Sequence, residues 1–494
     1  MLRVVWLCVV VTSLTVSASV AAKGPNVIVI LTDDIGYGDL SCFGAKAVKT
    51  PNLDKFAAGG MTFTDAHSPA AVCTPTRYSL MTGQYSFRHR PGASILPGNA
   101  PLSIPIDLFT LPKLFQQAGY ATGVVGKWHL GLGETETNYN VEIKPGPKEV
   151  GFDYSFLIPA TGDRVPCVFV ENARVVGYDP KDPIQVSFKN KIGNESTGKE
   201  HPELLTNQKP SHGHDNTIVN GISRIGYMTG GKAARWKDED IADTITGKAV
   251  KFITDNKAKP FFLYFATHDV HVPRVPHPRF KGTSGHGLRG DVIQECDWCV
   301  GEIVKTLAEN KLTDDTLIIF TSDNGGVRDD GYQDGIQTDK SGHSVNGVLK
   351  GFKGGLLEGG HRIPMIASWP GHVPAGATST ELMCHVDMLA TFAAMLEQKL
   401  PAGANPDGVN VLPAYLAAKP EKPCRTELIH QAGNLSYLAL RQGNYKYIPP
   451  PPMNMKAEPQ LYDVVEDISE TKNLAKDKPE MVKAMAARLA ELRK

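Results

Sequence analysis

Two pairs of adjacent side chains in this sequence offer only hard oxygen ligands. Asp33 and Asp34 form one pair, and Asp323 and Asn324 form the other. Carboxylate and amide oxygens suit Ca²⁺ or Mg²⁺ and argue against zinc or copper. Either pair taken alone is equally compatible with a cap or turn at the end of a strand. Two such pairs together favour a divalent cation site.

A cysteine stands at the start of a predicted helix. Thr74 is a suitable N-cap and Pro75 suits the first helical position, so we expect a helix to begin directly after Cys73. The unpaired N–H groups and the positive end of the helix dipole would then face an anion held at residue 73, and Arg77 adds a full positive charge. The segment therefore predicts an anion site at Cys73, whereas a cysteine considered by itself is more often a structural thiol.

The elements that position these residues are predicted from four apolar runs, each of which ends in a polar cluster. Runs this rich in β-branched and aromatic residues are typical of strands buried on both faces of a parallel sheet. Helical patterns lie between them. Ligands of open α/β sheets bind beyond the carboxyl ends of the strands, so we expect the polar clusters to meet there. The runs are 27–31 before Asp33-Asp34, 121–126 before Lys127-Trp128-His129, 261–266 before His268 to His271, and 317–320 before Asp323-Asn324.

The sequence predicts an α/β fold with a large mixed, mostly parallel sheet sandwiched by helices over residues 23–400. Between about residues 140 and 240 the pattern weakens, which favours long loops over the sheet edge. After residue 400, short strands are predicted at 428–431, 437–442 and 445–448, and a helix at 479–494. Residues 401–494 are therefore predicted to form a small C-terminal α+β domain with a short antiparallel sheet.

Several separated motifs resemble those of one enzyme family. Cys73-x-Pro75-x-Arg77 with Thr82-Gly83 is similar to the signature of the type I sulfatases, in which this cysteine is oxidised to formylglycine (3-oxoalanine). The resemblance covers nearly the whole chain after residue 22, in order, and includes the arylsulfatases and N-acetylgalactosamine sulfatases. It implies the architecture of the alkaline phosphatase superfamily. The other matching motifs are Asp33-Asp34, 126–131, 268–273, 322–325, 353–355 with 358–360, 440–447, and 461–463 with 473–474.

The resemblance also implies roles for individual residues. Asp33, Asp34, Asp323, Asn324 and the modified Cys73 would bind the metal, with Ca²⁺ favoured and Mg²⁺ a second choice. One hydroxyl of hydrated formylglycine would attack sulfur, and the second would lose a proton to His129 so that sulfate is released. Arg77 and Lys127 would orient the formylglycine, while Lys353 and His271 would face the sulfate and the leaving group, with His271 as general acid. His268 is a weaker candidate, because either it or His271 could be turned away from the site.

Charge and the first residues bear on partners and location. The chain has 52 Lys and Arg against 52 Asp and Glu, so no global field favours a nucleic acid partner. Residues 1–22 are typical of a signal peptide, and their apolar part is too short for a membrane span. We therefore expect an exported protein, secreted or periplasmic, without a stable membrane anchor. A maturation enzyme that generates formylglycine is an implied partner.

The predicted substrate is a sulfate ester, preferably of a carbohydrate, with aryl sulfates kept as an alternative. The loops between 161 and 240 carry polar groups able to bind hydroxyls and carboxylates, namely Asp163, Arg164, His212, His214 and Arg235. Two rival functions are a phosphodiesterase or phosphonate hydrolase of the same superfamily, and a binding protein that holds sulfated glycans without cleaving them. The complete set of a nucleophile and proton donors argues against the binding protein.

Overall fold

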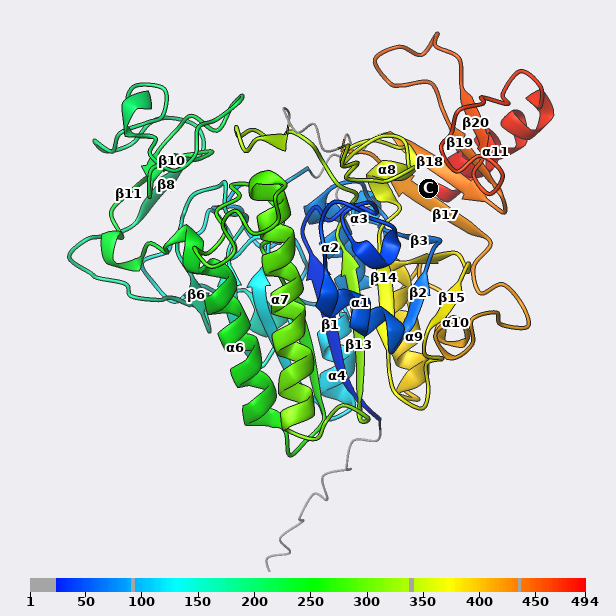
Figure 1. Cartoon of the computed structure of the whole chain (residues 1–494), viewed down its shortest axis with the longest axis horizontal. Helices are drawn as coiled ribbons and strands as arrows, with labels where there is room; N and C mark the ends of the chain where they lie inside the picture. The colour runs from blue at the N-terminus through cyan, green and yellow to red at the C-terminus, as the bar shows by residue number, and fades with distance from the viewer. Residues whose placement is uncertain (1–23, 90–93, 337–341, 434–436) are drawn as a thin grey trace, which may run out of the picture.

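A mixed sheet of ten strands runs through the centre of the molecule (Figure 1). The computed structural model describes residues 24–89, 94–336, 342–433 and 437–494, so the predicted leader at 1–22 lies outside the described residues. The strand order is β15-β2-β14-β13-β1-β12-β4-β5-β6-β7. The five parallel strands at its centre are β13 (Thr316–Ser322), β1 (Asn26–Thr32), β12 (Phe261–Ala266), β4 (Ala121–Lys127) and β5 (Tyr154–Ile158).

The remaining strands flank this parallel centre. β14 (Met365–Ser368), β2 (Met61–Phe63) and β15 (Ala377–Ser379) extend it beyond β13, and β14 runs antiparallel to both β13 and β2. At the other edge, β6 (Val170–Glu171) pairs antiparallel with β5, and β7 (Arg174–Val175) pairs antiparallel with β6. The predicted mixed, mostly parallel sheet is thus confirmed.

All four apolar runs form strands at the centre of this sheet. Every residue of β1, β4, β12 and β13 is buried, as expected where helices cover both faces. The register aligns Leu31 of β1 with Ala266 of β12 and with Thr321 of β13. The residues that follow these strands therefore emerge at the same edge.

Helices cover both faces of the sheet (Figure 1). α1 (Pro51–Ala58), α6 (Ile241–Asn256) and α7 (Gly287–Glu309) lie on one face, and α2 (Cys73–Thr82), α4 (Leu111–Gln117) and α9 (Met388–Met395) on the other. Phe115 of α4 stacks on Phe262 of β12 with ring centroids 4.1 Å apart. On the opposite face, Phe252 of α6 lies so close to Gly123 of β4 that a Cβ there would stand 2.6 Å from its ring. These contacts build one continuous core.

The region predicted as loops contains short strand pairs beyond the β6–β7 edge (Figure 1). β8 (Gln185–Ser187) pairs antiparallel with β11 (Tyr227–Thr229), and β9 (Ile218–Val219) with β10 (Ile222–Ser223). Strands of two or three residues are too short to produce a detectable period, which is why the sequence indicated loops alone.

The C-terminal part forms a separate four-stranded antiparallel sheet, as predicted. Its strands are β17 (Glu427–Gln431), β18 (Leu438–Gln442), β19 (Tyr445–Ile448) and β20 (Gln460–Asp463), and α11 (Pro479–Leu492) packs on it. Gly443, with φ of 56°, makes the turn between β18 and β19. Two backbone hydrogen bonds join β17 to the segment before Cys73, from Ala71 N to Gln431 O (2.8 Å) and from Gln431 N to Pro69 O (3.0 Å). The domain boundary at 400/401 stays a prediction.

Shorter elements complete the described chain. No helix in the described ranges is both long and apolar enough to cross a bilayer. The remaining α-helices and strands are α3 (Ser86–His89), α5 (Pro147–Val150), α8 (Glu358–His361), α10 (Leu412–Leu416), β3 (Ala66–His67) and β16 (Met383–Cys384), and the 3₁₀ turns are Ser41–Phe43, Pro202–Leu204, Lys232–Ala234, Asp238–Asp240 and His385–Asp387.

Candidate active site

The polar clusters predicted from the sequence meet at the carboxyl ends of the parallel strands. Backbone hydrogen bonds join them, from Asp323 N to Thr32 O (3.1 Å), from Asp33 N to Asp269 O (3.2 Å) and from Val270 N to Asp33 O (2.7 Å). The segments after β1, β13 and β12 are therefore in direct contact. Lys127, the last residue of β4, reaches the same place through its side chain.

The two pairs of oxygen ligands form one buried cluster. Asp33, Asp34, Asp323 and Asn324 are all 0 % exposed, and Asn324 Nδ2 donates to Asp34 Oδ1 (2.7 Å). Asp33 Oδ1 and Asn324 Oδ1 have no hydrogen-bond partner among the described residues. Buried polar atoms are rarely left without a partner, so two such oxygens in one cluster fit a divalent cation. Asp33, Asp34 and His271 each offer a ligand atom within 4.8 Å of the others.

Three cationic side chains surround these carboxylates. Lys127 Nζ lies 2.5 Å from Asp33 Oδ2, and Lys353 Nζ donates to Asp34 Oδ2 (2.9 Å). Arg77 donates from Nε (3.0 Å) and Nη2 (2.8 Å) to the same oxygen of Asp323, Oδ2. Each of these three carboxylates therefore has one oxygen paired with a cation, and the second oxygen of Asp33 stays available as a ligand atom.

The pKa values in the cluster follow from burial and from these charges. Burial raises the pKa of Asp33, although Lys127 opposes the shift. Burial and the neighbouring Asp33 raise the pKa of Asp323. At Asp34 burial acts in the same direction, but Lys353 and His271 outweigh it and lower the pKa. Three carboxylates held this close resist ionising together, and a bound cation would relieve that repulsion.

Cys73 lies among these charges at the start of α2. It is 1 % exposed, and the charges of Lys127, Lys353, Asp323 and Asp33 all act on its thiol. Burial is the largest influence and raises the pKa of the thiol, so the unmodified side chain stays protonated at neutral pH. Cys73 therefore lies, as the sequence predicts, at the start of a helix and among charged side chains.

The predicted N-cap of this helix was wrong. α2 begins at Cys73 itself, and Val72 is its N-cap, in extended conformation and without a side-chain cap. Thr74 Oγ1 instead donates to the His129 carbonyl oxygen (3.1 Å), so a tertiary hydrogen bond replaces the local cap. Pro75 is the third helical residue rather than the first. An N–H at this position would have no acceptor within the helix, so proline is tolerated there as well.

His129 follows β4 and is fixed as one tautomer. Its Nε2 lies 3.0 Å from the Leu96 carbonyl oxygen, which can only accept, so Nε2 carries the hydrogen. The unprotonated Nδ1 is buried and has no partner among the described residues. Burial and Lys127 lower the pKa of His129 far below its ordinary value. His129 is therefore a neutral imidazole with an available lone pair.

His271 lies close to the carboxylates of Asp34 and Asp330. Its Nδ1 is 2.7 Å from the Val272 carbonyl oxygen, and its Nε2 faces Asp34 Oδ2 (3.9 Å) and Asp330 Oδ2 (3.6 Å). Burial and Lys353 lower the pKa of His271 to about 4. The second candidate, His268, packs so closely against Gly162 that a Cβ on this glycine would stand 2.5 Å from the imidazole ring. The ring centroids of His268 and His271 are 6.5 Å apart.

One residue of the site was missed by the sequence analysis. Asp330 accepts a hydrogen bond from Lys353 (2.7 Å), so that Lys353 bridges Asp330 and Asp34. These two carboxylates outweigh burial and raise the pKa of Lys353 far above its ordinary value. Asp330 lies in an irregular segment outside the recognised motifs, and only its proximity in space reveals its part.

Comparison with known proteins agrees with this geometry. A family model described as Sulfatase matches residues 25–397. The chain belongs to the sulfatase family. It is 49 % identical over 484 residues to N-acetylgalactosamine-6-O-sulfatase of Bacteroides thetaiotaomicron, which covers 96 % of this chain and 94 % of that protein. It is 32 % identical over 395 residues to human Arylsulfatase A, covering 80 % of this chain and 68 % of the relative.

Solved structures give the same assignment for the fold. A sulfatase structure titled for the metabolism of multiple glycosaminoglycans by Bacteroides thetaiotaomicron superposes with a TM-score of 0.91 and 49 % identity, over 95 % of this chain and 99 % of the other. The phosphonate monoester hydrolase of Agrobacterium radiobacter shares the fold alone, with a TM-score of 0.56 at 18 % identity. This sulfatase is thus a hydrolase of sulfate esters with the alkaline phosphatase-like architecture expected from the sequence.

Proposed function

We propose that this sulfatase removes sulfate from a sulfated amino sugar, with 6-sulfated N-acetylgalactosamine as the first substrate to test. The observation that carries the proposal is 49 % identity, over nearly the full length of both chains, to a relative named for that activity. Arylsulfatase A is more distant, at 32 % identity. The proposal refines the carbohydrate preference of the sequence analysis.

Polar residues beside the site support a sugar substrate. Arg164 Nη1 and His214 Nε2 both contact Asp163 carboxylate oxygens, at 2.8 and 3.0 Å. His271 lies close enough to Asp163, and Cys73 to Arg164, for their ionised forms to interact electrostatically, so this group borders the reacting centre. A buried carboxylate with cationic neighbours is suited to bind sugar hydroxyls in fixed orientations.

The other two polar candidates of this region lie elsewhere. Arg235 donates to Glu195 Oε1 and to the Gly230 carbonyl oxygen, both at 2.9 Å, which braces the surrounding loop. The side chain of His212 is 66 % exposed and faces Asp329. Neither contact is with Asp163, so we assign the sugar-binding role to Asp163, Arg164 and His214.

We further propose that Cys73 is converted to formylglycine by a maturation enzyme and that Asp33, Asp34, Asp323 and Asn324 hold Ca²⁺ beside it. The hydrated aldehyde supplies a pair of hydroxyls at residue 73, and the cation supplies positive charge that acidifies one of them and attracts the sulfate. Oxygen ligands alone favour Ca²⁺ or Mg²⁺, and the family resemblance favours Ca²⁺.

The chain's own residues then perform the proton transfers. His129 Nδ1 accepts the proton of the second hydroxyl, because Nε2 is committed to Leu96. Arg77 and Lys127 orient residue 73 and hold the carboxylates of Asp323 and Asp33 in place. Lys353 faces the sulfate, and His271 donates a proton to the departing alcohol. Since burial and Lys353 lower the pKa of His271, its protonation depends on the negative charge that a bound sulfate ester adds.

The substrate test is a panel assay of sulfate release. The purified protein is given N-acetylgalactosamine 6-sulfate, the 4-sulfate isomer, N-acetylglucosamine 6-sulfate, an aryl sulfate and an aryl phosphate. We expect the first to be favoured by about tenfold or more in kcat/KM, since a buried polar group of the site that loses its hydrogen-bond partner costs about 1–3 kcal/mol. Turnover of the aryl sulfate with no saccharide desulfated would refute the proposal. Turnover of the aryl phosphate that exceeds turnover of every sulfate ester would favour the hypothesis of a phosphodiesterase or phosphonate hydrolase.

A pair of variants separates sugar binding from chemistry. Asp163→Asn should lower kcat/KM for the saccharide far more than for the aryl sulfate. Arg235→Gln is the matched control, because Arg235 is in the same region but pairs with Glu195.

The mass of the peptide that contains residue 73, measured on the mature protein, tests the conversion to formylglycine. The N-terminus of that protein tests export and removal of residues 1–22.

A further inference from the structure

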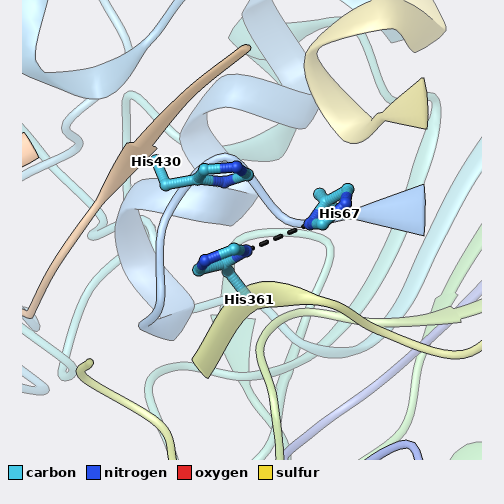
Figure 2. Close-up of side chains that lie close together, drawn as sticks. All are labelled: His67, His361 and His430. Carbon is cyan, nitrogen blue, oxygen red and sulfur yellow. Dashed lines mark hydrogen bonds between the residues drawn. The ribbon is translucent and has the colours of Figure 1, made fainter. Parts of the chain in front are cut away.

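Away from the active site, three buried histidines from distant parts of the sequence face one another (Figure 2). His67 ends β3, His361 ends α8 and His430 lies in β17. All three are 0 % exposed, and each offers a ring nitrogen within 4.8 Å of the others. The proposed reaction uses none of them, so this histidine cluster (His67, His361 and His430) needs a physical explanation of its own.

Hydrogen bonds around two of these rings leave two nitrogen lone pairs facing each other. His67 Nε2 lies 2.8 Å from Asp65 Oδ1, and His361 Nε2 lies 3.1 Å from the Leu356 carbonyl oxygen. Both oxygens are acceptors, and the Leu356 oxygen is closer to His361 Nε2 than Lys446 Nζ is (3.4 Å), so we assign a hydrogen to each Nε2. A neutral imidazole has a single N–H, so both Nδ1 atoms are then unprotonated, although they are 3.0 Å apart. A positive species between them, either a proton or a metal ion, would stabilise this pair.

The surroundings favour a metal ion over a proton. Burial lowers the pKa of each of the three imidazoles, and Lys446 lowers that of His361 further. Neutral imidazole is the form that binds metals. Metal-binding histidines also commonly donate their outer N–H to a carboxylate or a backbone carbonyl. The outer N–H of His67 faces the Asp65 carboxylate, and that of His361 faces the Leu356 carbonyl oxygen.

His430 supplies the third potential ligand. Neither of its ring nitrogens has a hydrogen-bond partner among the described residues, which is unfavourable for a buried imidazole. Its ring stacks on His361, with centroids 3.7 Å apart and an angle of 18° between the planes (Figure 2). No hydrogen bond from the described residues fixes the ring rotation, so a tilt out of the stack can direct a nitrogen toward the other two.

The charges around the histidine cluster are balanced before any metal binds. Lys446 Nζ contacts Glu358 (2.7 Å) and Glu470 (2.6 Å), and its 3.4 Å contact with His361 is to Nε2, not to the Nδ1 that faces His67. Asp65 faces Arg362 (3.5 Å) and Arg441 (3.4 Å). The three carboxylates match the three cations, so affinity for a dication must come from the imidazoles themselves.

We propose that His67, His361 and His430 form a structural Zn²⁺ site, with a water molecule as fourth ligand. Three imidazoles suit Zn²⁺ and are poor ligands for Ca²⁺, so the site is chemically distinct from the oxygen cluster around Asp33. Bound zinc would tie β17 of the C-terminal sheet to β3 and α8 of the sulfatase domain. This connection lies next to the segment that leads into Cys73.

Metal analysis of the full mature chain tests the proposal. The protein is equilibrated with Zn²⁺ in excess Ca²⁺, which occupies the oxygen cluster, then dialysed, and both metals are counted by mass spectrometry. We expect a single zinc per chain. His361→Asn and His430→Asn should each lower zinc retention about tenfold or more with calcium unchanged, and Asp65→Asn should weaken zinc affinity about 10–100-fold. His385→Asn is the matched control, a buried histidine that contacts Thr321 instead (3.0 Å).

A wild-type chain that retains no zinc, or zinc retained in full by both histidine variants, would overturn the proposal. If the variants fail to fold, two measurements on the wild-type protein remain. The visible spectrum after Co²⁺ substitution should be that of a tetrahedral site with nitrogen ligands. Anomalous diffraction at the zinc edge should give a peak between the rings of His67 and His361, and a peak only at the oxygen cluster would contradict the assignment.

Discussion

Glu295 provides a quantitative test of how burial controls ionisation beneath the active site. Its side chain lies on α7, is 2 % exposed and accepts a hydrogen bond from His277 N (3.1 Å). Burial, reinforced by the nearby Asp269 carboxyl, raises the pKa of Glu295 from 4.5 to about 9. The folded protein therefore keeps a proton on Glu295 over a pH range in which the unfolded chain has lost it.

The sign and size of the effect follow from proton linkage. The unfolded state binds fewer protons between pH 4.5 and about 9, so the free energy of unfolding falls as pH rises through this window. Each pH unit contributes about 1.4 kcal/mol, and pH 7 lies 2.5 units above the unfolded-state pKa of 4.5, so roughly 3 kcal/mol has been lost at pH 7. Glu295→Gln keeps the acceptor oxygen and does not ionise. We expect the variant to match the wild type near pH 4.5 and to be more stable by that amount at pH 7.

Urea unfolding followed by tryptophan fluorescence at several pH values measures this difference. Glu302→Gln is the control, since Glu302 lies on the same helix with 31 % of its side chain exposed, and it should change stability by less than about 0.5 kcal/mol. A stability difference for Glu295→Gln that stays constant with pH, or that favours the wild type at pH 8, would show that Glu295 is ionised in the fold and would refute the reasoning.

Three further predictions concern the active site. His129→Gln should lower kcat by about 10²–10⁴-fold with little change in KM, because the proposed base acts only on the enzyme-bound group. Steady-state kinetics with the preferred substrate checks this prediction, and a change confined to KM would contradict it. Asp33→Asn should weaken Ca²⁺ binding about tenfold or more by calorimetry, and unchanged affinity would place the cation elsewhere. Lys353→Met should lower kcat/KM about 10²-fold by removing a charge that faces sulfate, whereas wild-type kinetics would show that Lys353 only neutralises Asp34 and Asp330.

The central sheet could be predicted because its strands are buried on both faces. Continuous apolar runs such as 27–31 and 261–266 have few alternatives to a parallel strand, and parallel strands bring the residues after them to one edge. The oxygen ligands that follow two of these strands could therefore be predicted to lie together as a cation site. The α2 cap failed as a prediction because Thr74 bonds across to His129, a long-range contact that no local pattern encodes.

Hydrogen-bond partners that lie in irregular segments could not be predicted from the sequence. Asp330 bridges to Lys353 although no motif marks it, and Leu96 selects the His129 tautomer through a backbone carbonyl, which has no side-chain signal. The histidine cluster joins positions 67, 361 and 430, and its contacts depend on how the C-terminal sheet docks. Such arrangements arise only from tertiary structure.

The pairing of Gln431 with the segment before Cys73 has a consequence for the order of events in the cell. Gln431 is synthesised 358 residues after Cys73, a delay of roughly 20–70 s at ordinary translation rates. In the folded chain, where Gln431 pairs with Pro69 and Ala71, Cys73 is 1 % exposed and is out of reach of another enzyme. Any modification of Cys73 must therefore occur during this interval or on a chain still kept open. If Cys73 is converted to formylglycine as proposed, the rates of synthesis and folding set the fraction of molecules that receive this modification.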